Sequence, residues 1–195
     1  MAATCREGVV LGADSRTTMG VYVAHRISDK IEPIHSRIFC MRTGVSAHTQ
    51  TMARYVRHYL SQHAIEEGTM PSVSTAARLF QMIAYQNKDF LQAAIICAGW
   101  DPVMGPQVYD ITLGGSLIQE PYSISGSGSG FMYGYCDANW REDMTLQECK
   151  DFVAQSVSLA MTRDGSSGGI IRLCTVTPEQ VVREYMPQEN LPYKL

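Results

Sequence analysis

A chain of 195 residues that is 45% apolar and 18% charged can bury one large core and is too apolar to be disordered, so we expect a single domain over residues 1–195. Its formal net charge of −3 gives no electrostatic attraction to nucleic acid or to an anionic membrane, and we expect neither as a partner. No apolar run approaches the ~18 residues that a transmembrane helix needs.

The start of the chain predicts several short strands. Residues 2–5 and 9–13 are mostly apolar and lie on either side of residues 6–8, Arg-Glu-Gly, which are typical of a hairpin turn. Residues 20–24 and 38–42 are expected to form two further strands.

Two helices are predicted next. Residues 49–66 have helical spacing, and Gly68 is expected to end this helix. Residues 74–86 are predicted to form the second helix, with Ser74 as its N-cap. The expected apolar stripe of the first helix consists of Met52, Tyr55, Val56, Tyr59, Leu60 and His63.

The second half of the chain repeats this order. Strands are predicted at residues 93–98, 107–112 and 122–125, then helices at 131–140 and 145–162, then strands at 169–175 and 180–185. The second of these helices opens with Thr-Leu-Gln-Glu, the pattern of a capping box.

The order of strands, two helices, strands, two helices and strands indicates the fold class. Hairpin-length connections favour antiparallel pairing over parallel βαβ units. The run Ala-Ala-Ile-Ile-Cys-Ala at residues 93–98 has no polar alternation, as expected of a strand covered on both faces. We therefore predict an α+β fold, a four-layer α/β/β/α sandwich of two antiparallel sheets flanked by helix pairs.

Cysteine and histidine usage argues against disulfides and metals. The six cysteines form no CxxC pattern and most lie in apolar runs, which is typical of core residues in a reduced, intracellular protein. The five histidines fit no common zinc-binding spacing. We expect no metal and no cofactor.

Three loops combine acidic and hydroxyl side chains. Asp14 follows an apolar strand and precedes Ser-Arg-Thr-Thr, residues 125–131 read SGSGSGF, and residues 163–169 read RDGSSGG. Two of these loops have a purely structural interpretation, a hydrogen-bonded turn at Asp14 and a glycine helix stop in RDGSSGG. Phosphate binding is disfavoured because neither GxGxxG nor GxxxxGK[ST] is present. Together, the loops suggest a site where hydroxyl groups orient a nucleophile.

Five segments together resemble the β-type subunits of the 20S proteasome, in the same order and over nearly the whole chain. They are GVVLGADSRTT, ISDK, CMRTG, GSGSGFMYGYCD and RDGSSGG. The resemblance implies a four-layer N-terminal-nucleophile hydrolase and a threonine-type endopeptidase. Arg42 in CMRTG and the DGSSGG loop are most similar to the eukaryotic subunits with caspase-like specificity, which cleave after acidic residues.

The resemblance also implies catalytic roles. The nucleophile is the hydroxyl of an N-terminal threonine, and its α-amino group, with a pKa near ~8, acts as the base. Lys30 would favour the alkoxide and Asp14 would position Lys30, while the N–H of Gly44 would belong to the oxyanion hole. Ser127, Asp164 and Ser167 would surround the α-amino group and a proton-relaying water.

A second set of residues matches the family's pocket for the residue before the scissile bond. It consists of Thr17, Thr18, Ser28, Arg42 and Ser46. Arg42 would bind an acidic side chain through two parallel hydrogen bonds. The alternative is that Arg42 turns outward and pairs with a surface acid.

The family's mature chain begins three residues before the equivalent of Met1, so the resemblance implies a nucleophilic threonine upstream of Met1. We expect that threonine in the mature subunit, because the residues that would surround it are kept. The alternative is a non-catalytic structural β subunit. Either would assemble with other α- and β-type subunits in stacked heptameric rings, in the cytoplasm and nucleus, to degrade unfolded polypeptides. Residues 185–195 are expected to lie across a neighbouring subunit.

Overall fold

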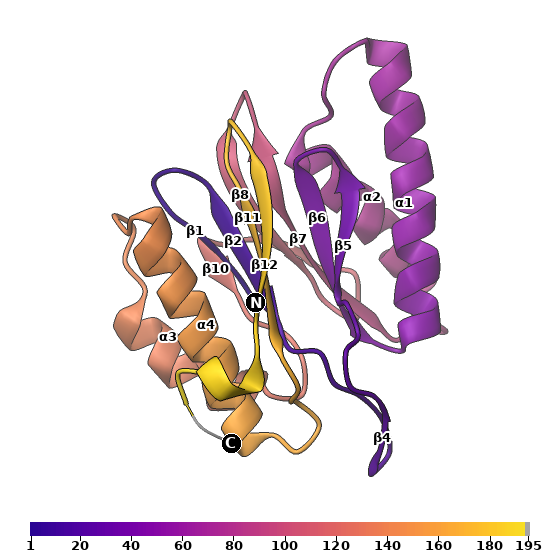
Figure 1. The fold of residues 1–195 in the computed structure, drawn as a ribbon. Helices are drawn as coiled ribbons and strands as arrows, with labels where there is room; N and C mark the ends of the chain where they lie inside the picture. Colours follow the sequence, from indigo (N-terminus) through magenta and orange to yellow (C-terminus); the bar gives the residue numbers. More distant parts are fainter. Residues whose placement is uncertain (194–195) are drawn as a thin grey trace.

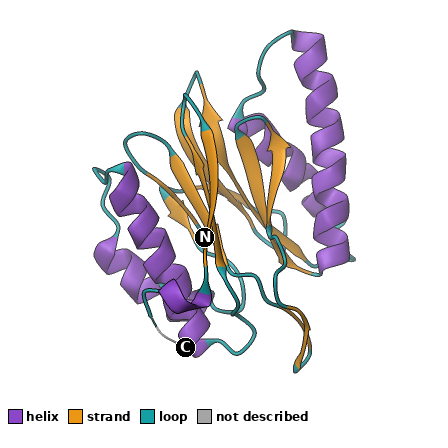
Figure 2. Ribbon diagram, in the orientation of Figure 1, coloured by secondary structure: helices purple, strands orange, loops and turns teal. Residues whose placement is uncertain are grey.

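Two antiparallel sheets lie face to face between two pairs of helices (Figures 1 and 2). The structure is a computed structural model that describes residues 1–193. The observed layers are helices, sheet, sheet and helices, so the predicted four-layer α/β/β/α sandwich is confirmed.

The first sheet contains the start of the chain and has the strand order β10-β1-β2-β11-β12. Its strands are β1 (Ala2–Thr4), β2 (Val9–Ala13), β10 (Tyr122–Ser123), β11 (Ile171–Val176) and β12 (Val181–Met186). The predicted hairpin joins β1 to β2, and the N–H of Cys5 donates to the carbonyl of Gly8 over 2.9 Å. The outer face of this sheet is covered by α3 (Tyr133–Asn139) and α4 (Leu146–Arg163), and the short helix η1 (Ser129–Phe131) precedes α3. Thr145 and Glu148 form the predicted capping box of α4.

The second sheet has the strand order β5-β6-β7-β8-β9. Its strands are β5 (Ile31–His35), β6 (Ile38–Gly44), β7 (Ala93–Asp101), β8 (Gly105–Ile111) and β9 (Leu117–Gln119), and its helices are α1 (Ser46–Glu67) and α2 (Val73–Gln86). A separate hairpin of β3 (Thr17–Met19) and β4 (Tyr22–His25) projects from the end of the sandwich (Figure 1).

Strand β7 shows how the apolar pattern builds the layers. Ile95 and Cys97 pack beneath the helices, whereas Ile96 and Ala98 pack between the two sheets. All four side chains are buried, as expected of a strand covered on both faces. The sandwich therefore has three apolar layers, one between the sheets and one under each helix pair.

Helix details differ from the predictions. In α1, Met52, Val56 and Leu60 are buried, but Tyr55 and Tyr59 are 54% and 51% exposed, so the predicted stripe is too wide. Helix α1 belongs to an outer layer and buries a narrow stripe with i, i+4 spacing. Gly68 ends the helix in the left-handed conformation, as predicted.

The boundaries of other elements also differ from the predicted ones. Ser72, not Ser74, caps α2, because its side chain accepts a hydrogen bond from the N–H of Thr75 over 3.0 Å. The helix predicted at residues 131–140 is divided into η1 and α3. Strands β3, β5 and β9 were not predicted at all.

The C-terminal segment packs on its own subunit as far as it is described. Leu191 is buried in the core beside α4, and the backbone N–H of Tyr193 donates to Ser158 Oγ over 2.9 Å. Sequence analysis did not predict this docking, and residues 194–195 lie outside the described residues. Over residues 1–193, no helix is long and apolar enough to cross a membrane. All six cysteines are buried and unpaired.

Candidate active site

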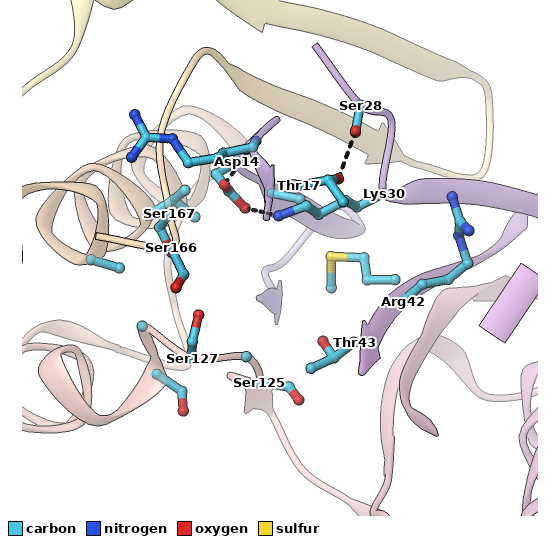
Figure 3. Close-up of a pocket in the computed structure, with 18 of the residues that line it drawn as sticks. Asp14, Thr17, Ser28, Lys30, Arg42, Thr43, Ser125, Ser127, Ser166 and Ser167 are labelled. Carbon is cyan, nitrogen blue, oxygen red and sulfur yellow. Dashed lines mark hydrogen bonds and ion pairs between the residues drawn. The ribbon is translucent and has the colours of Figure 1, made fainter. Parts of the chain in front are cut away.

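A cavity of about 710 Å³ lies at the end of the sandwich where both sheets meet the loops after β10 and α4 (Figure 3). Every residue predicted for the site lines this cavity except Asp164, which lies directly behind Ser127 and Ser167. The lining residues from the prediction are Asp14, Thr17, Thr18, Ser28, Lys30, Arg42, Gly44, Ser46, Ser127 and Ser167.

The ion pair of Lys30 and Asp14 forms one wall. Asp14 follows the last residue of β2, and Lys30 directly precedes β5, so the pair joins the two sheets. Lys30 Nζ lies 2.5 Å from Asp14 Oδ1. Asp14 Oδ2 accepts hydrogen bonds from the N–H groups of Arg16 and Gly168, each over 3.0 Å. Backbone donors thus fix the carboxylate, and the carboxylate fixes the ammonium group at the cavity wall.

The second wall is a cluster of hydroxyl groups around Asp164. Ser127 Oγ and Ser167 Oγ each donate to Asp164 Oδ2 over 2.6 Å, and the N–H of Ser166 donates to Oδ1 over 3.0 Å. Burial acts to raise the pKa of Asp164, but these hydrogen bonds and the charge of Lys30 outweigh it and lower the pKa below its ordinary value. Because both serine protons point to the carboxylate, each serine oxygen can still accept a hydrogen bond from a group in the cavity.

The last two of the three glycines in RDGSSGG, Gly168 and Gly169, allow close approach of the loop to the segment directly after β2. A Cβ on Gly168 would lie 2.4 Å from the guanidinium carbon of Arg16, and a Cβ on Gly169 would lie 2.2 Å from Ser15 Oγ. Gly169 also has a φ of +85°, which favours glycine. Helix α4 ends at Arg163 with Asp164 as an extended C-cap, and Gly165 does not have a positive φ, so the interpretation of a glycine helix stop is wrong.

Ser15 and Arg16 hold this loop, and neither was predicted to do so. Ser15 is fully buried, and its Oγ donates to the carbonyl of Arg26 over 2.5 Å and accepts from the N–H of Ile170 over 3.0 Å. Arg16 Nη1 donates to the carbonyl of Gly165 over 2.8 Å. Their position beside Asp14 was the only local signal, and it does not reveal contacts to a loop so distant in sequence.

Of the residues predicted to bind substrate, Figure 3 shows Arg42 across the cavity from Ser127 and Ser167. Thr17 Oγ1 and Ser28 Oγ are 2.7 Å apart and share a hydrogen bond. Arg42 does not turn out into solvent, since its side chain is only 14% exposed and lines the cavity. It nevertheless has an acidic neighbour, because its Nε lies 3.2 Å from Glu32 Oε2. Gly44 has a φ of +101°, and a Cβ there would lie 2.4 Å from the carbonyl oxygen of Gln92.

Met1, which directly precedes β1, also lines the cavity. The nitrogen of Met1 is buried, and it donates to the carbonyl of Gly12 over 2.8 Å. Burial lowers the pKa of the Met1 amino group to about 5. This environment therefore favours an uncharged nitrogen over an ammonium group.

Comparison with known proteins identifies similar chains. A family model described as "Proteasome subunit" matches residues 1–176, a range that includes every cavity residue named above. "Proteasome subunit beta type-6" of Dictyostelium discoideum is 52% identical over 98% of this chain and 90% of its own length. "Proteasome subunit beta type-1" of Saccharomyces cerevisiae is 49% identical over 94% of this chain and 85% of its own length. "Probable proteasome subunit beta type-1" of Schizosaccharomyces pombe is 49% identical over 92% of this chain and 80% of its own length.

Proposed function

Because the chain belongs to the proteasome subunit family, as a β-type subunit of the 20S core, we propose that it is a threonine endopeptidase that cleaves after acidic residues. One observation carries the proposal. The Lys30–Asp14 pair and the hydroxyl cluster of Ser127, Asp164 and Ser167 line or flank one cavity that the buried Met1 also lines.

The nucleophile in this proposal is a threonine three residues upstream of Met1. An uncharged peptide nitrogen suits the buried position of Met1, and the chain before it would continue along the cavity between Lys30 and Ser127. The threonine's α-amino group would then lie near serine oxygens that can accept its hydrogen bonds. The charge of Lys30 would stabilise negative charge on the threonine Oγ.

The proposed reaction has two stages. The threonine Oγ attacks the substrate carbonyl carbon, and its proton passes to the α-amino nitrogen, directly or through a water. As the C–N bond breaks, this proton moves to the leaving amine, and an ester remains on the threonine. A water then attacks the ester with the same amine as base, which releases the acid product and restores the hydroxyl. The N–H of Gly44 would stabilise the oxyanion of both tetrahedral intermediates.

Specificity in this proposal comes from the polar side of the cavity. Arg42 lines it with a permanently charged guanidinium, and Thr17, Thr18, Ser28 and Ser46 add hydroxyl groups to the lining of the same cavity. An apolar side chain placed there would leave these groups partly desolvated and unpaired, which disfavours it relative to Glu or Asp.

As a member of this family, the chain assembles with other proteasome subunits. We further propose that it does so in stacked heptameric rings that degrade unfolded polypeptides, in the cytoplasm and the nucleus. Cell fractionation followed by native gels would test both parts.

Activity is tested in assembled core particles in which the other active subunit types are inhibited. N-terminal sequencing should find threonine at the start of the mature subunit. Lys30→Ala should lower kcat for a peptide cleaved after Glu by at least ~10³-fold, because Lys30 would stabilise the attacking oxygen. Lys88→Ala is the matched control, since Lys88 contacts Tyr85 at the end of α2 and does not line the cavity. Correctly assembled particles that have the threonine but do not cleave after Glu would refute the proposal in favour of a non-catalytic subunit.

A further inference from the structure

Glu32 on β5 lies between two arginines from different elements. Its Oε2 is 3.2 Å from Nε of Arg42 on β6, and its Oε1 accepts a hydrogen bond from Nη2 of Arg57 on α1 over 2.8 Å. The Glu32 side chain is only 20% exposed, so these charges interact with limited screening by water. Glu32 does not line the cavity itself and can act on a bound molecule only through Arg42.

The two contacts of Glu32 are of different kinds. Arg57 makes an aligned hydrogen bond to the carboxylate, and its Nε also donates to the carbonyl of Pro33 over 2.9 Å. Arg42 Nε is close enough for an ion pair, yet it is buried without a hydrogen-bond partner among the described residues. Arg57 therefore anchors Glu32, whereas the attraction of Glu32 for Arg42 is mainly electrostatic.

The remaining contact of Arg42 holds it from another direction. Its Nη2 donates to the backbone carbonyl of Asp29 over 2.8 Å, and this contact does not depend on Glu32. Loss of the Glu32 charge would thus leave the guanidinium held at the cavity wall but without its only acidic neighbour within 4.0 Å among the described residues. An incoming carboxylate would then meet a full positive charge.

We propose that Glu32 is a positioning residue that limits the preference of the cavity for acidic side chains, and that Arg57 sets how strongly it does so. This inference rests on the proposed function, in which Arg42 binds the acidic residue before the scissile bond. The carboxylate of Glu32 competes with the substrate carboxylate for Arg42. Arg57 draws part of the Glu32 charge toward α1 and so leaves Arg42 more available.

The proposal predicts opposite effects from two neighbouring substitutions. Glu32→Gln keeps the size of the side chain and removes its charge, so discrimination in favour of Glu should rise. Arg57→Gln leaves the Glu32 charge to Arg42 alone, so discrimination should fall. A purely structural role for the cluster would instead make both variants lose acidic specificity together.

The experiment measures kcat/KM for matched peptides cleaved after Glu and after Leu, in assembled core particles with the other active subunits inhibited. The Glu-to-Leu ratio should rise about 5-fold in Glu32→Gln and fall about 3-fold in Arg57→Gln, as expected for one charge acting near a partly desolvated cavity. The matched controls are Arg54→Gln, an exposed arginine one turn earlier on α1, and Glu67→Gln at the end of that helix, and both should leave the ratio unchanged.

Each result bears on a separate claim. The inference is overturned if the ratio stays the same or falls in Glu32→Gln, or if it stays the same or rises in Arg57→Gln. In either case, cleavage after Glu by the wild type still upholds the proposed function. Absence of wild-type cleavage after Glu refutes the proposed function and, with it, the inference. Should Glu32→Gln fail to assemble, Glu32→Ala replaces it, since it also removes the charge; its ratio should rise, and an unchanged or lower ratio overturns the inference.

Discussion

Ser15→Ala tests how the cavity is held together, because Ser15 joins three segments without lining the cavity. Its buried Oγ binds the carbonyl of Arg26 at 2.5 Å and the N–H of Ile170 at 3.0 Å. Alanine fills almost the same space but leaves both backbone groups without this partner. An unsatisfied buried backbone group costs ~1–3 kcal/mol, so about 2 kcal/mol is expected for opening the loop at Ile170 alone.

The expected readout is local. A loss of about 2 kcal/mol corresponds to about 30-fold faster hydrogen exchange at the Ile170 amide if exchange occurs through local opening. Mass spectrometry of a peptide that covers residues 164–170, taken from assembled particles, measures this rate. Peptide cleavage should also slow, because Gly168 in the same loop donates a hydrogen bond to Asp14 and thereby helps to hold Lys30.

The matched control is Ser61→Ala on α1. Ser61 is exposed, and its Oγ donates to the carbonyl of Arg57 over 2.8 Å, within its own helix. Its loss should leave exchange at residues 164–170 unchanged. Wild-type exchange of this loop in Ser15→Ala would refute the idea that Ser15 holds it in place.

Three further predictions concern specificity, pH and assembly. Arg42→Met should lower cleavage after Glu at least ~10-fold, about 1.4 kcal/mol of transition-state binding, while cleavage after Leu holds or rises; equal use of both peptides would contradict this. The pKa of Asp164 is lowered in the folded chain, so its ionised form stabilises the fold above its unfolded pKa of ~3.9, and this contribution is lost as the pH falls through the lowered value. Asp164→Asn should therefore unfold at a lower temperature than the wild type near neutral pH, and calorimetry should find that this difference shrinks in acid rather than staying constant. Native mass spectrometry at micromolar concentration should detect complexes with other proteasome subunits, and a chain that stays monomeric in their presence would contradict assembly.

Elements with a strong local pattern could be predicted from the sequence. The capping box at Thr145 and the uninterrupted apolar run of β7 depend on neighbouring residues, and both were found as predicted. Strand β5 was missed because Ile-Glu-Pro-Ile-His includes a proline and a charge. It is an edge strand, where a missing N–H and a polar side chain are tolerated.

The site could be predicted only in part, because most of its contacts join residues that lie far apart in the sequence. Resemblance to a family identified Asp14, Lys30, Ser127, Asp164 and Ser167, which lie far apart in sequence and come together in the fold. The residues that hold them were not identified. Whether a serine or glutamate meets a distant partner depends on how the sheets pack, and no local spacing in the sequence encodes that packing.

The two carboxylates of the site, Asp14 and Asp164, have different hydrogen-bond and ion-pair partners, and this difference gives them different roles. Asp14 receives an ammonium group and two backbone N–H donors, so its charge is matched by Lys30 and its oxygens are occupied. Asp164 receives two hydroxyl groups and one N–H but forms no ion pair within residues 1–193, so no direct partner there neutralises its charge. Protonation of Asp164 would weaken it as the acceptor for Ser127 and Ser167 and free both hydroxyl groups to turn. Burial alone would favour this protonation, but the hydrogen bonds and the charge of Lys30 outweigh it and lower the pKa, so Asp164 stays ionised at neutral pH. Two serine oxygens thereby remain directed as acceptors beside the fixed charge of Lys30.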